Sequence, residues 1–393
     1  SGKVFGFNMK DHEGSYSVEQ TVLSNLNRAS DIDVDGSSRL YLADWKGGRF
    51  SYGGGVPVSR IHMSQLKGYT APVVPEFSKL NDQELVKALS GPSATIRLQA
   101  QQHLLLKGLT KGSIKLLGEL ASNKLEDVLV RIAALFTLKQ GQGEASHKLC
   151  LELLNDPAMR TYALKALTDR KSQLSNVSAD VIGKYLSDSD PKVRLQAAIS
   201  LRRLNKYTEG SVSELIKMAT SSWKEDSVGK LGTAALPHIA SRALAGLGQS
   251  HTAVWKQYLK TFIKSDYKTQ KALSYGLKTI HSLDLIDALI SELASDNYKD
   301  ESRLVVLDIL ARLSHKEKEW DLKYWWGTRP HDEGPYYESI EWEGTARIIK
   351  AIEKNFQKFS NESQLKVLDV VSLNQINPSS LKLEGVDTLF FAF

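Results

Sequence analysis

One arginine-centred pattern recurs four times in this chain and constrains its fold more than any other feature. Each arginine follows an apolar residue and precedes an alanine three positions later and a leucine seven positions later. The four copies centre on Arg97, Arg131, Arg160 and Arg194, which are 34, 29 and 34 residues apart. Positions three and seven after the arginine share one helical face, where alanine admits a paired helix and leucine fills the layer between repeats. The pattern predicts a stacked array of helical pairs.

Helix-start signals accompany the pattern. Asp156-Pro157 and Asp190-Pro191 each precede one of these helices, with aspartate able to cap and proline suited to the first turn. The segment Asp190-Pro191-Lys192-Val193-Arg194 resembles the signature of HEAT repeats. Weaker copies follow at Asp266 and at Asp300–Arg303. We expect about six to eight helical pairs in a solenoid spanning residues 81–314.

Residues 1–66 instead show the alternation of apolar and polar residues that is typical of β-strands. The predicted elements are a strand at 4–7, a hairpin of 31–36 with 39–45, and a strand at 58–63 after a glycine-rich loop at 47–55. This is too little for an autonomous sheet, so we interpret it as the terminal blade of a β-propeller whose other blades lie upstream. A linker at 67–80 follows. The predicted fold class is mainly α, a HEAT-type α-solenoid preceded by a short β segment.

The hairpin turn is acidic. Asp31, Asp33, Asp35 and Gly36 match the first half of a calcium loop, but the twelfth position is Leu42 rather than a bidentate glutamate. Two interpretations stay open: an acidic turn without a metal, and a turn supported by Ca²⁺, which would offset the repulsion among three carboxylates.

Tryptophan and tyrosine concentrate near the end of the chain. Residues 315–345 are predicted to form a loop, and 346–393 the closing helices of the solenoid. One interpretation is that the rings of the loop pack against the solenoid. The other is a stacking platform for a sugar or another planar ligand. The candidate ligand-binding residues are Trp325, Trp326, Arg329, His331, Asp332, Tyr336 and Tyr337.

Composition and motif searches exclude several function classes. The net charge is +6, but basic and acidic residues are interspersed, so nucleic acid is not an expected partner. No run of about 18 apolar residues predicts a membrane span. The single cysteine, Cys150, lies in an apolar run and is expected to be a buried, inert thiol. No nucleophile, phosphate-loop or metalloprotease motif occurs, so no catalytic residue is predicted.

The Trp-rich run Trp325-Trp326-Gly327, the strand 40–45 and the repeat array together resemble one family. Its members are exported proteins of planctomycete and verrucomicrobial type that join a propeller similar to quinoprotein sugar dehydrogenases, HEAT repeats and a c-type cytochrome domain. The resemblance implies a periplasmic or outer-surface location. It also implies pyrroloquinoline quinone (PQQ) and haem c, both bound outside residues 1–393. No catalytic residue of the family maps onto this chain.

The leading functional hypothesis is a non-catalytic interaction scaffold that holds a propeller and a downstream domain or partner. The alternatives are a segment of a quinone- and haem-dependent sugar oxidoreductase and polysaccharide binding through the Trp-rich loop. The chain opens with Ser1-Gly2-Lys3-Val4 rather than methionine, so we expect a processed product or a piece of a longer protein.

Overall fold

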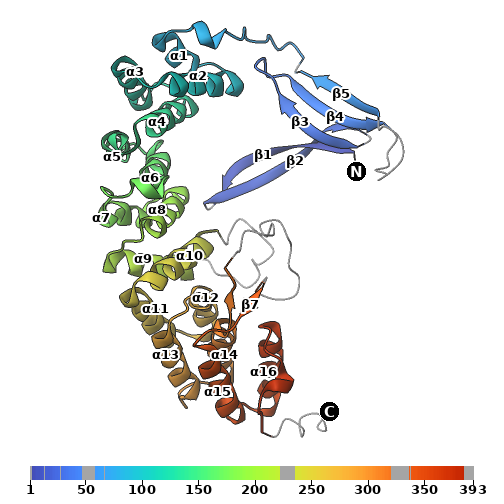
Figure 1. Cartoon of the computed structure of the whole chain (residues 1–393), viewed down its shortest axis with the longest axis vertical. Helices are drawn as coiled ribbons and strands as arrows, with labels where there is room; N and C mark the ends of the chain where they lie inside the picture. Colours follow the sequence, from blue (N-terminus) through green and yellow to red (C-terminus); the bar gives the residue numbers. More distant parts are fainter. Residues whose placement is uncertain are drawn as a thin grey trace. The chain divides into compact units, whose positions relative to one another are not determined.

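The computed structural model of the chain describes residues 2–12, 14–26, 28–46, 58–65, 67–221, 235–319, 336 and 338–384. The chain divides into two compact units. Unit 1 comprises Ser1–Ser178 and Ser189–Ser200, and unit 2 comprises Ala179–Asp188 and Leu201–Phe393. Strands come first and helices follow in succession (Figure 1), which confirms the predicted mainly α solenoid behind a short β segment.

Five strands form two antiparallel sheets in unit 1. The strands are β1 Lys3–His12, β2 Ser15–Asn25, β3 Ala29–Val34, β4 Leu40–Lys46 and β5 Val58–Ser64. β1 pairs with β2, and the second sheet has the order β3-β4-β5. In the second sheet Val34 lies opposite Leu40, and Leu40 lies opposite Ser64. The predicted hairpin and third strand are therefore confirmed, whereas the assignment of these strands to a propeller stays a prediction.

The β1–β2 hairpin is longer than the sequence indicates. Only a strand at 4–7 was expected, yet β1 has ten residues and β2 has eleven. Nearly every side chain of β2 is exposed. The apolar residues Tyr16, Val18 and Val22 nevertheless alternate with polar ones, a strand signal that the prediction did not use.

Unit 1 continues with α-helices that begin after the predicted linker, within which one 3₁₀ helix forms. The α-helices are α1 Asp82–Ala88, α2 Ala94–Lys107, α3 Lys111–Ser122, α4 Val128–Gln142, α5 His147–Leu153 and α6 Arg160–Thr168; α8 Pro191–Leu204 lies mainly in this unit. The 3₁₀ helices are η1 Phe77–Lys79, η2 Gly143–Ser146 and η3 Lys171–Gln173. α1 begins with a capping box, in which Asn81 Oδ1 accepts from Glu84 N at 3.0 Å and Asn81 N donates to Glu84 Oε2 at 2.8 Å.

Unit 2 carries the remaining helices. These are α7 Ala179–Gly183, η4 Lys184–Ser187, α9 Glu209–Thr220, α10 Ala235–Ser250, α11 Thr252–Lys264, α12 Tyr267–Leu277, α13 Leu283–Ala294, α14 Asp300–Leu313, α15 Thr345–Asn355, η6 Phe356–Lys358, α16 Asn361–Leu373 and η7 Pro378–Ser380. The predicted loop 315–345 contains two short antiparallel strands, β6 Lys316–Glu317 and β7 Ser339–Ile340. α15 starts within the predicted loop, one residue before the expected closing helices.

Contacts between helices define two layers in each unit. In unit 1, α1 packs on α2 and α3, and α2 packs on α4. In unit 2, α11 packs on α12 and α13, α12 packs on α14, and α14 packs on α16. In unit 2 the odd-numbered helices from α7 to α15 stack on one another and form the odd layer, and the even-numbered helices from α10 to α16 form the even layer. In unit 1 the corresponding contacts join α1 to α3, α2 to α4 and α4 to α6. Repeats that contact only their neighbours in this way make an α-solenoid. Among the described residues, six pairs of successive helices are in contact, within the expected range: α1–α2, α3–α4, α5–α6, α9–α10, α11–α12 and α13–α14.

The repeated arginine pattern has a clear structural basis. The alanines three positions after each arginine are fully buried, and the leucines seven positions after are at most 2% exposed. The guanidinium groups donate to carbonyl oxygens at the end of the preceding helix or just beyond it. These bonds join Arg97 to Gly91 (2.7 Å), Arg131 to Ala121 (3.0 Å), Arg160 to Leu154 (2.9 Å) and Arg194 to Ser189 (3.1 Å). Since carbonyls at a helix end lack intrahelical partners, Arg131 and Arg160 cap the preceding helix, whereas Arg97 and Arg194 bond to the turn that follows it.

Candidate functional site

Most of the predicted aromatic site lies outside the described residues. This applies to Trp325, Trp326, Arg329, His331, Asp332 and Tyr337. Tyr336 is the predicted site residue that the structure describes. The nearby Trp342, which belongs to the same tryptophan-rich region, is described as well.

The side chain of Tyr336 packs within unit 2. Its side chain is 2% exposed, and its hydroxyl donates a hydrogen bond to the carbonyl oxygen of Arg312. The Arg312 guanidinium carbon lies 4.0 Å from the centre of the tyrosine ring. Burial raises the pKa of Tyr336 above its usual value. A ring covered in this way packs within unit 2, while ligand binding by the Trp-rich loop stays a prediction.

Trp342 links the segment that precedes α15 to the end of α14. Its indole Nε1 donates to the carbonyl oxygen of Leu313 at 2.9 Å. One side of the indole carries the Lys316 ammonium 4.1 Å from a ring centre, and the His281 ring meets it edge-on at 5.3 Å. These contacts give the indole a structural role in unit 2.

The three candidate metal ligands occupy the β3–β4 hairpin. Asp31 and Asp33 are exposed in β3, and each carboxylate accepts from the backbone N–H of the next residue, at 2.8 and 2.7 Å. Asp35 lies in the turn and accepts from Ser37 N and Arg39 N, both at 2.9 Å. The hydrogen bond from Arg39 N, above all, holds the pKa of Asp35 below its usual value. Within the part of the chain that the structure describes, no three acidic, histidine or cysteine side chains gather as a metal site.

A groove of about 500 Å³ crosses the even layer of unit 2. Its lining residues come from α12, α14 and α16 and include Tyr267, Lys271 and Tyr275 of α12 and Lys278 directly after it. Tyr267 and Tyr275 are each 42% exposed. Their spacing of eight residues places both rings on one face of α12, with the lysines between and beyond them. We refer to these lining residues as the even-layer groove.

Charge pairs partly neutralise the even-layer groove. Lys278 Nζ lies 2.5 Å from Asp308 Oδ2 and joins α12 to α14. On α16, Lys366 Nζ lies 2.7 Å from Glu362 Oε1, and this hydrogen bond raises the pKa of Lys366. The unusual content of the groove is therefore exposed aromatic surface rather than excess charge. The alternation of tyrosine and lysine along residues 267–278 could have indicated this groove from the sequence. A search for repeats does not detect that pattern.

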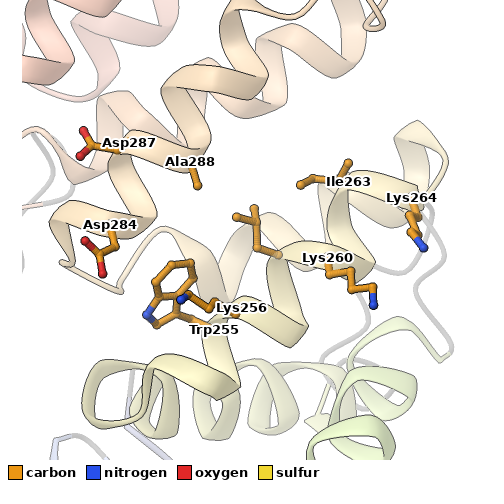
Figure 2. Close-up of a pocket in the computed structure, with 9 residues that line it drawn as sticks. Trp255, Lys256, Lys260, Ile263, Lys264, Asp284, Asp287 and Ala288 are labelled. Atoms are coloured by element: carbon orange, nitrogen blue, oxygen red, sulfur yellow. The ribbon is translucent and has the colours of Figure 1, made fainter.

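A second groove, also about 500 Å³, lies in the odd layer of unit 2 between α11 and α13. Figure 2 shows Lys260 and Lys264 toward one end and Asp284 and Asp287 toward the other, where Lys256 also lies. Its apolar middle is formed by Leu259, Ile263 and Ala288, and Trp255 lies near the acidic end. We refer to these lining residues as the odd-layer groove.

Unit 1 contains a buried basic pair that the sequence did not reveal. Lys139 of α4 is 0% exposed, and its Nζ lies 2.7 Å from Nε2 of the buried His147. Burial lowers the pKa of both groups, and for His147 the neighbouring lysine lowers it further. Cys150 is also 0% exposed, and burial raises the pKa of its thiol to about 11. The predicted buried thiol is confirmed, and the side chains of Lys139, His147 and Cys150 are all shielded from solvent.

No helix in the described parts of the chain has the length and apolar character needed to cross a membrane.

Comparisons with known proteins bear only on the fold. No protein-family model matches the chain. No curated protein matches it either.

Among solved structures, the chain is similar to YibA of E. coli, with 14% identity, a TM-score of 0.38 and coverage of 75% of this chain and 94% of that chain. It is also similar to a mutant form of the karyopherin Kap121p, with 13% identity, a TM-score of 0.47 and coverage of 82% of this chain and 35% of that chain. A third similarity, to human deoxyhypusine hydroxylase, has 14% identity, a TM-score of 0.26 and coverage of 74% and 95%. Similarities this distant assign no function.

The class of the protein follows from its own helix packing: it is a HEAT-type α-solenoid, a repeat scaffold preceded by a short β segment.

Proposed function

We propose that this solenoid is a protein-interaction scaffold that binds a partner polypeptide through the even-layer groove. The observation that carries the proposal is the pair of tyrosines, Tyr267 and Tyr275, that stay 42% exposed beside a 500 Å³ groove. Tyrosine is enriched at the energetically important positions of protein interfaces because it buries a large ring while its hydroxyl keeps a hydrogen bond. Repeat proteins typically bind through such extended surfaces.

The chemistry of the groove favours a polypeptide over a polyanion. Lys278 is already paired with Asp308, and Glu301 contributes a further carboxylate to the lining. A surface of mixed charge lacks the sustained positive potential that nucleic acid or an anionic membrane requires. Two aromatic rings beside paired charges instead fit an extended or helical segment with apolar anchors.

The resemblance to exported dehydrogenase-like proteins supports a finer version of this proposal. In it, the partner is a neighbouring domain of the same longer polypeptide or a protein of the same compartment. A c-type haem or a quinone would then belong to that neighbouring domain. The mass of the protein from its native source, measured with its visible absorption spectrum, tests this version. A mass well above 43.7 kDa with a haem Soret band supports it, and a mass of 43.7 kDa without a chromophore contradicts it.

Removing the two rings is expected to abolish partner binding without unfolding the chain. In Tyr267→Ser/Tyr275→Ser, proteins captured from the source cell by the immobilised parent should fall at least about tenfold, because hot-spot truncations commonly cost 2 kcal/mol or more. The readout is quantitative mass spectrometry of the captured proteins. Leu373→Ser is the matched control, since Leu373 is 70% exposed on α16 and does not line the groove. Equal capture by the parent and the tyrosine variant would contradict the proposal.

A further inference from the structure

The helices α8, α10 and α12 carry basic residues and no acidic ones. Within their bounds these helices contain no aspartate or glutamate, whereas α14 contains three acidic residues. The carboxylates that line the even-layer groove come from α14, which packs on α12, and α12 in turn packs on α10. The charge therefore changes from mixed at α14 to basic at α12 and α10. The basic residues are Lys192, Arg194, Arg202 and Arg203 of α8, Arg242 of α10, and Lys268 and Lys271 of α12.

Two of these residues, Arg202 and Arg242, converge on one face of α10. Arg242 and Gly246 are four residues apart in α10 and so share a helical face. The Arg202 side chain lies against Gly246, because a β-carbon at this glycine would stand 3.0 Å from both Cγ and Nε of Arg202. Arg202 thus reaches α10 roughly one helical turn from Arg242. Burial and the nearby charge of Arg242 lower the pKa of Arg202, as expected for two neighbouring cations.

Neither guanidinium is neutralised by the described residues. Both arginines are exposed, and within the described ranges no hydrogen bond or ion pair engages either of them. Lys278 and Lys366 of the even-layer groove differ in this respect, because each is paired with a carboxylate. A guanidinium presents a planar fork of N–H donors that matches a carboxylate. Two neighbouring guanidinium groups without a counter-ion therefore favour an acidic ligand.

His238 connects the two arginines to the even-layer groove. It precedes Arg242 by four residues on the same face of α10, and its ring centre lies 5.3 Å from that of Tyr275. Tyr275 is one of the two exposed tyrosines of the groove. All four residues of the row Tyr275, His238, Arg242 and Arg202 belong to unit 2. A ligand bound in the groove can therefore continue over α10 to both arginines.

The small number of free cations favours an acidic polypeptide over nucleic acid, whose backbone pairs many phosphates with separate basic side chains. We propose that Arg202 and Arg242 form a carboxylate-binding subsite beside the even-layer groove. It holds an acidic stretch of the same partner polypeptide whose apolar anchors pack on Tyr267 and Tyr275. This inference rests on the proposed function and adds the character of the partner: acidic residues next to apolar anchors.

Two peptides with matched sequences test the proposal. The acidic probe is fluorescein-Leu-Ser-Gly-Ser-Phe-Ser-Gly-Glu-Glu-Glu, and the neutral probe has glutamine in place of glutamate. Four extended residues separate the anchors because eight residues of α12 span about 12 Å. Three more reach the glutamates because packed helices lie about 8–10 Å apart. Fluorescence anisotropy with the full chain in about 0.15 M salt should show at least about fivefold tighter binding of the acidic probe, a preference that shrinks in 0.5 M salt, roughly three times that salt.

Removing the two guanidinium groups should abolish this preference. In Arg202→Gln/Arg242→Gln, the acidic probe is expected to bind no more tightly than the neutral probe. The matched control is Lys350→Gln/Lys354→Gln, which removes the same charge from exposed positions of α15 and should keep the preference. All four side chains are exposed, so both variants should retain the circular-dichroism spectrum and melting curve of the parent.

Three outcomes would overturn the carboxylate subsite. They are no binding of either probe to the parent, equal binding of both probes, and a preference that survives in the arginine variant. Tight, salt-sensitive binding of a 20-nucleotide single-stranded DNA that this variant loses would also overturn it, because the arginines would then serve nucleic acid. The Tyr267→Ser/Tyr275→Ser variant separates the two proposals. If it loses binding of both probes while the parent shows no preference, the subsite fails and the proposed function stands.

Discussion

Replacing Arg131 with alanine is expected to destabilise unit 1 by about 3 to 5 kcal/mol, the usual result of removing one partner from a buried ion pair. Arg131 is 3% exposed, and its guanidinium donates to Ala121 O at 3.0 Å and to Asp156 Oδ2 at 2.5 Å. The variant leaves a buried carboxylate and a helix-end carbonyl without their donor. Urea unfolding followed by circular dichroism measures the change, and hydrogen exchange of the α4 and α6 amides localises it.

The pKa of Asp156 shows why the pair matters. Burial alone would raise the pKa of this carboxyl, but hydrogen bonds from Arg131 and from Ala158 N outweigh burial and hold it below its usual value. Asp156 is therefore ionised in the folded protein and depends on Arg131 for compensation. This contact also joins one helical pair to the next, because Arg131 belongs to α4 and Asp156 precedes α6.

Arg97→Ala is the matched control for Arg131. Arg97 occupies the same repeat position and donates to Gly91 O and Pro92 O at 2.7 and 3.0 Å, but no ion pair involving it occurs among the described residues. It should cost only about 1 kcal/mol, the usual net contribution of such hydrogen bonds. Equal losses in the two variants would show that the Arg131–Asp156 pair is not what stabilises unit 1.

The second large effect is expected from the buried Lys139–His147 pair, whose removal should stabilise the protein in acid. In Lys139→Met/His147→Leu, the free energy of unfolding at pH 5 should rise by roughly 1 to 4 kcal/mol, the range seen when buried charged groups give way to apolar ones. Two basic groups share one hydrogen bond of 2.7 Å here, so both cannot be protonated without repulsion. The other ionisable groups acting on the pair are Glu144, Cys150, Asp169 and Arg170.

The direction of the pH dependence follows from the lowered pKa values. A base whose folded pKa lies below its unfolded value binds more protons when unfolded, so stability falls as pH falls. For His147 the loss begins near its usual pKa of 6.5, and for Lys139 it begins near 10.5. Thermal melts of the parent between pH 8 and 5 should therefore show a falling midpoint that is flatter in the double variant. Lys148→Met is the control, because Lys148 is exposed on the same helix and should leave the pH profile unchanged. A double variant that is less stable than the parent at pH 5 would contradict this account.

The repeat array was predictable from sequence because its determinants are local and periodic. The arginine, alanine and leucine positions recur on one helical face, and all four copies lie in helices or at their first residue. The β3–β4 hairpin was equally predictable, since Ile32 and Val34 alternate with Asp31 and Asp33 on either side of a turn. β2 carries the same alternation in Tyr16, Val18 and Val22, so this strand was also predictable although its side chains are exposed on both faces.

The candidate grooves could not be predicted in the same way. Each groove gathers side chains from helices that are far apart in sequence, such as Tyr275 of α12 and Lys366 of α16. Only the stacking of repeats makes these residues neighbours. The buried Lys139 is a similar case, because a lysine in a helix is normally expected to be exposed to solvent. Its burial depends on the packing of α5 and α6 nearby.

Partner proteins are expected to bind across the helices of unit 2. The most direct test is hydrogen–deuterium exchange of the full chain, with and without the protein that it captures from its source cell. Protection on binding should map to the even-layer groove, in residues 267–278, 301–308 and 366–370, and the Tyr267→Ser/Tyr275→Ser variant should lose it. Protection confined to the strands β1–β5 or to the helices of unit 1 would contradict the account.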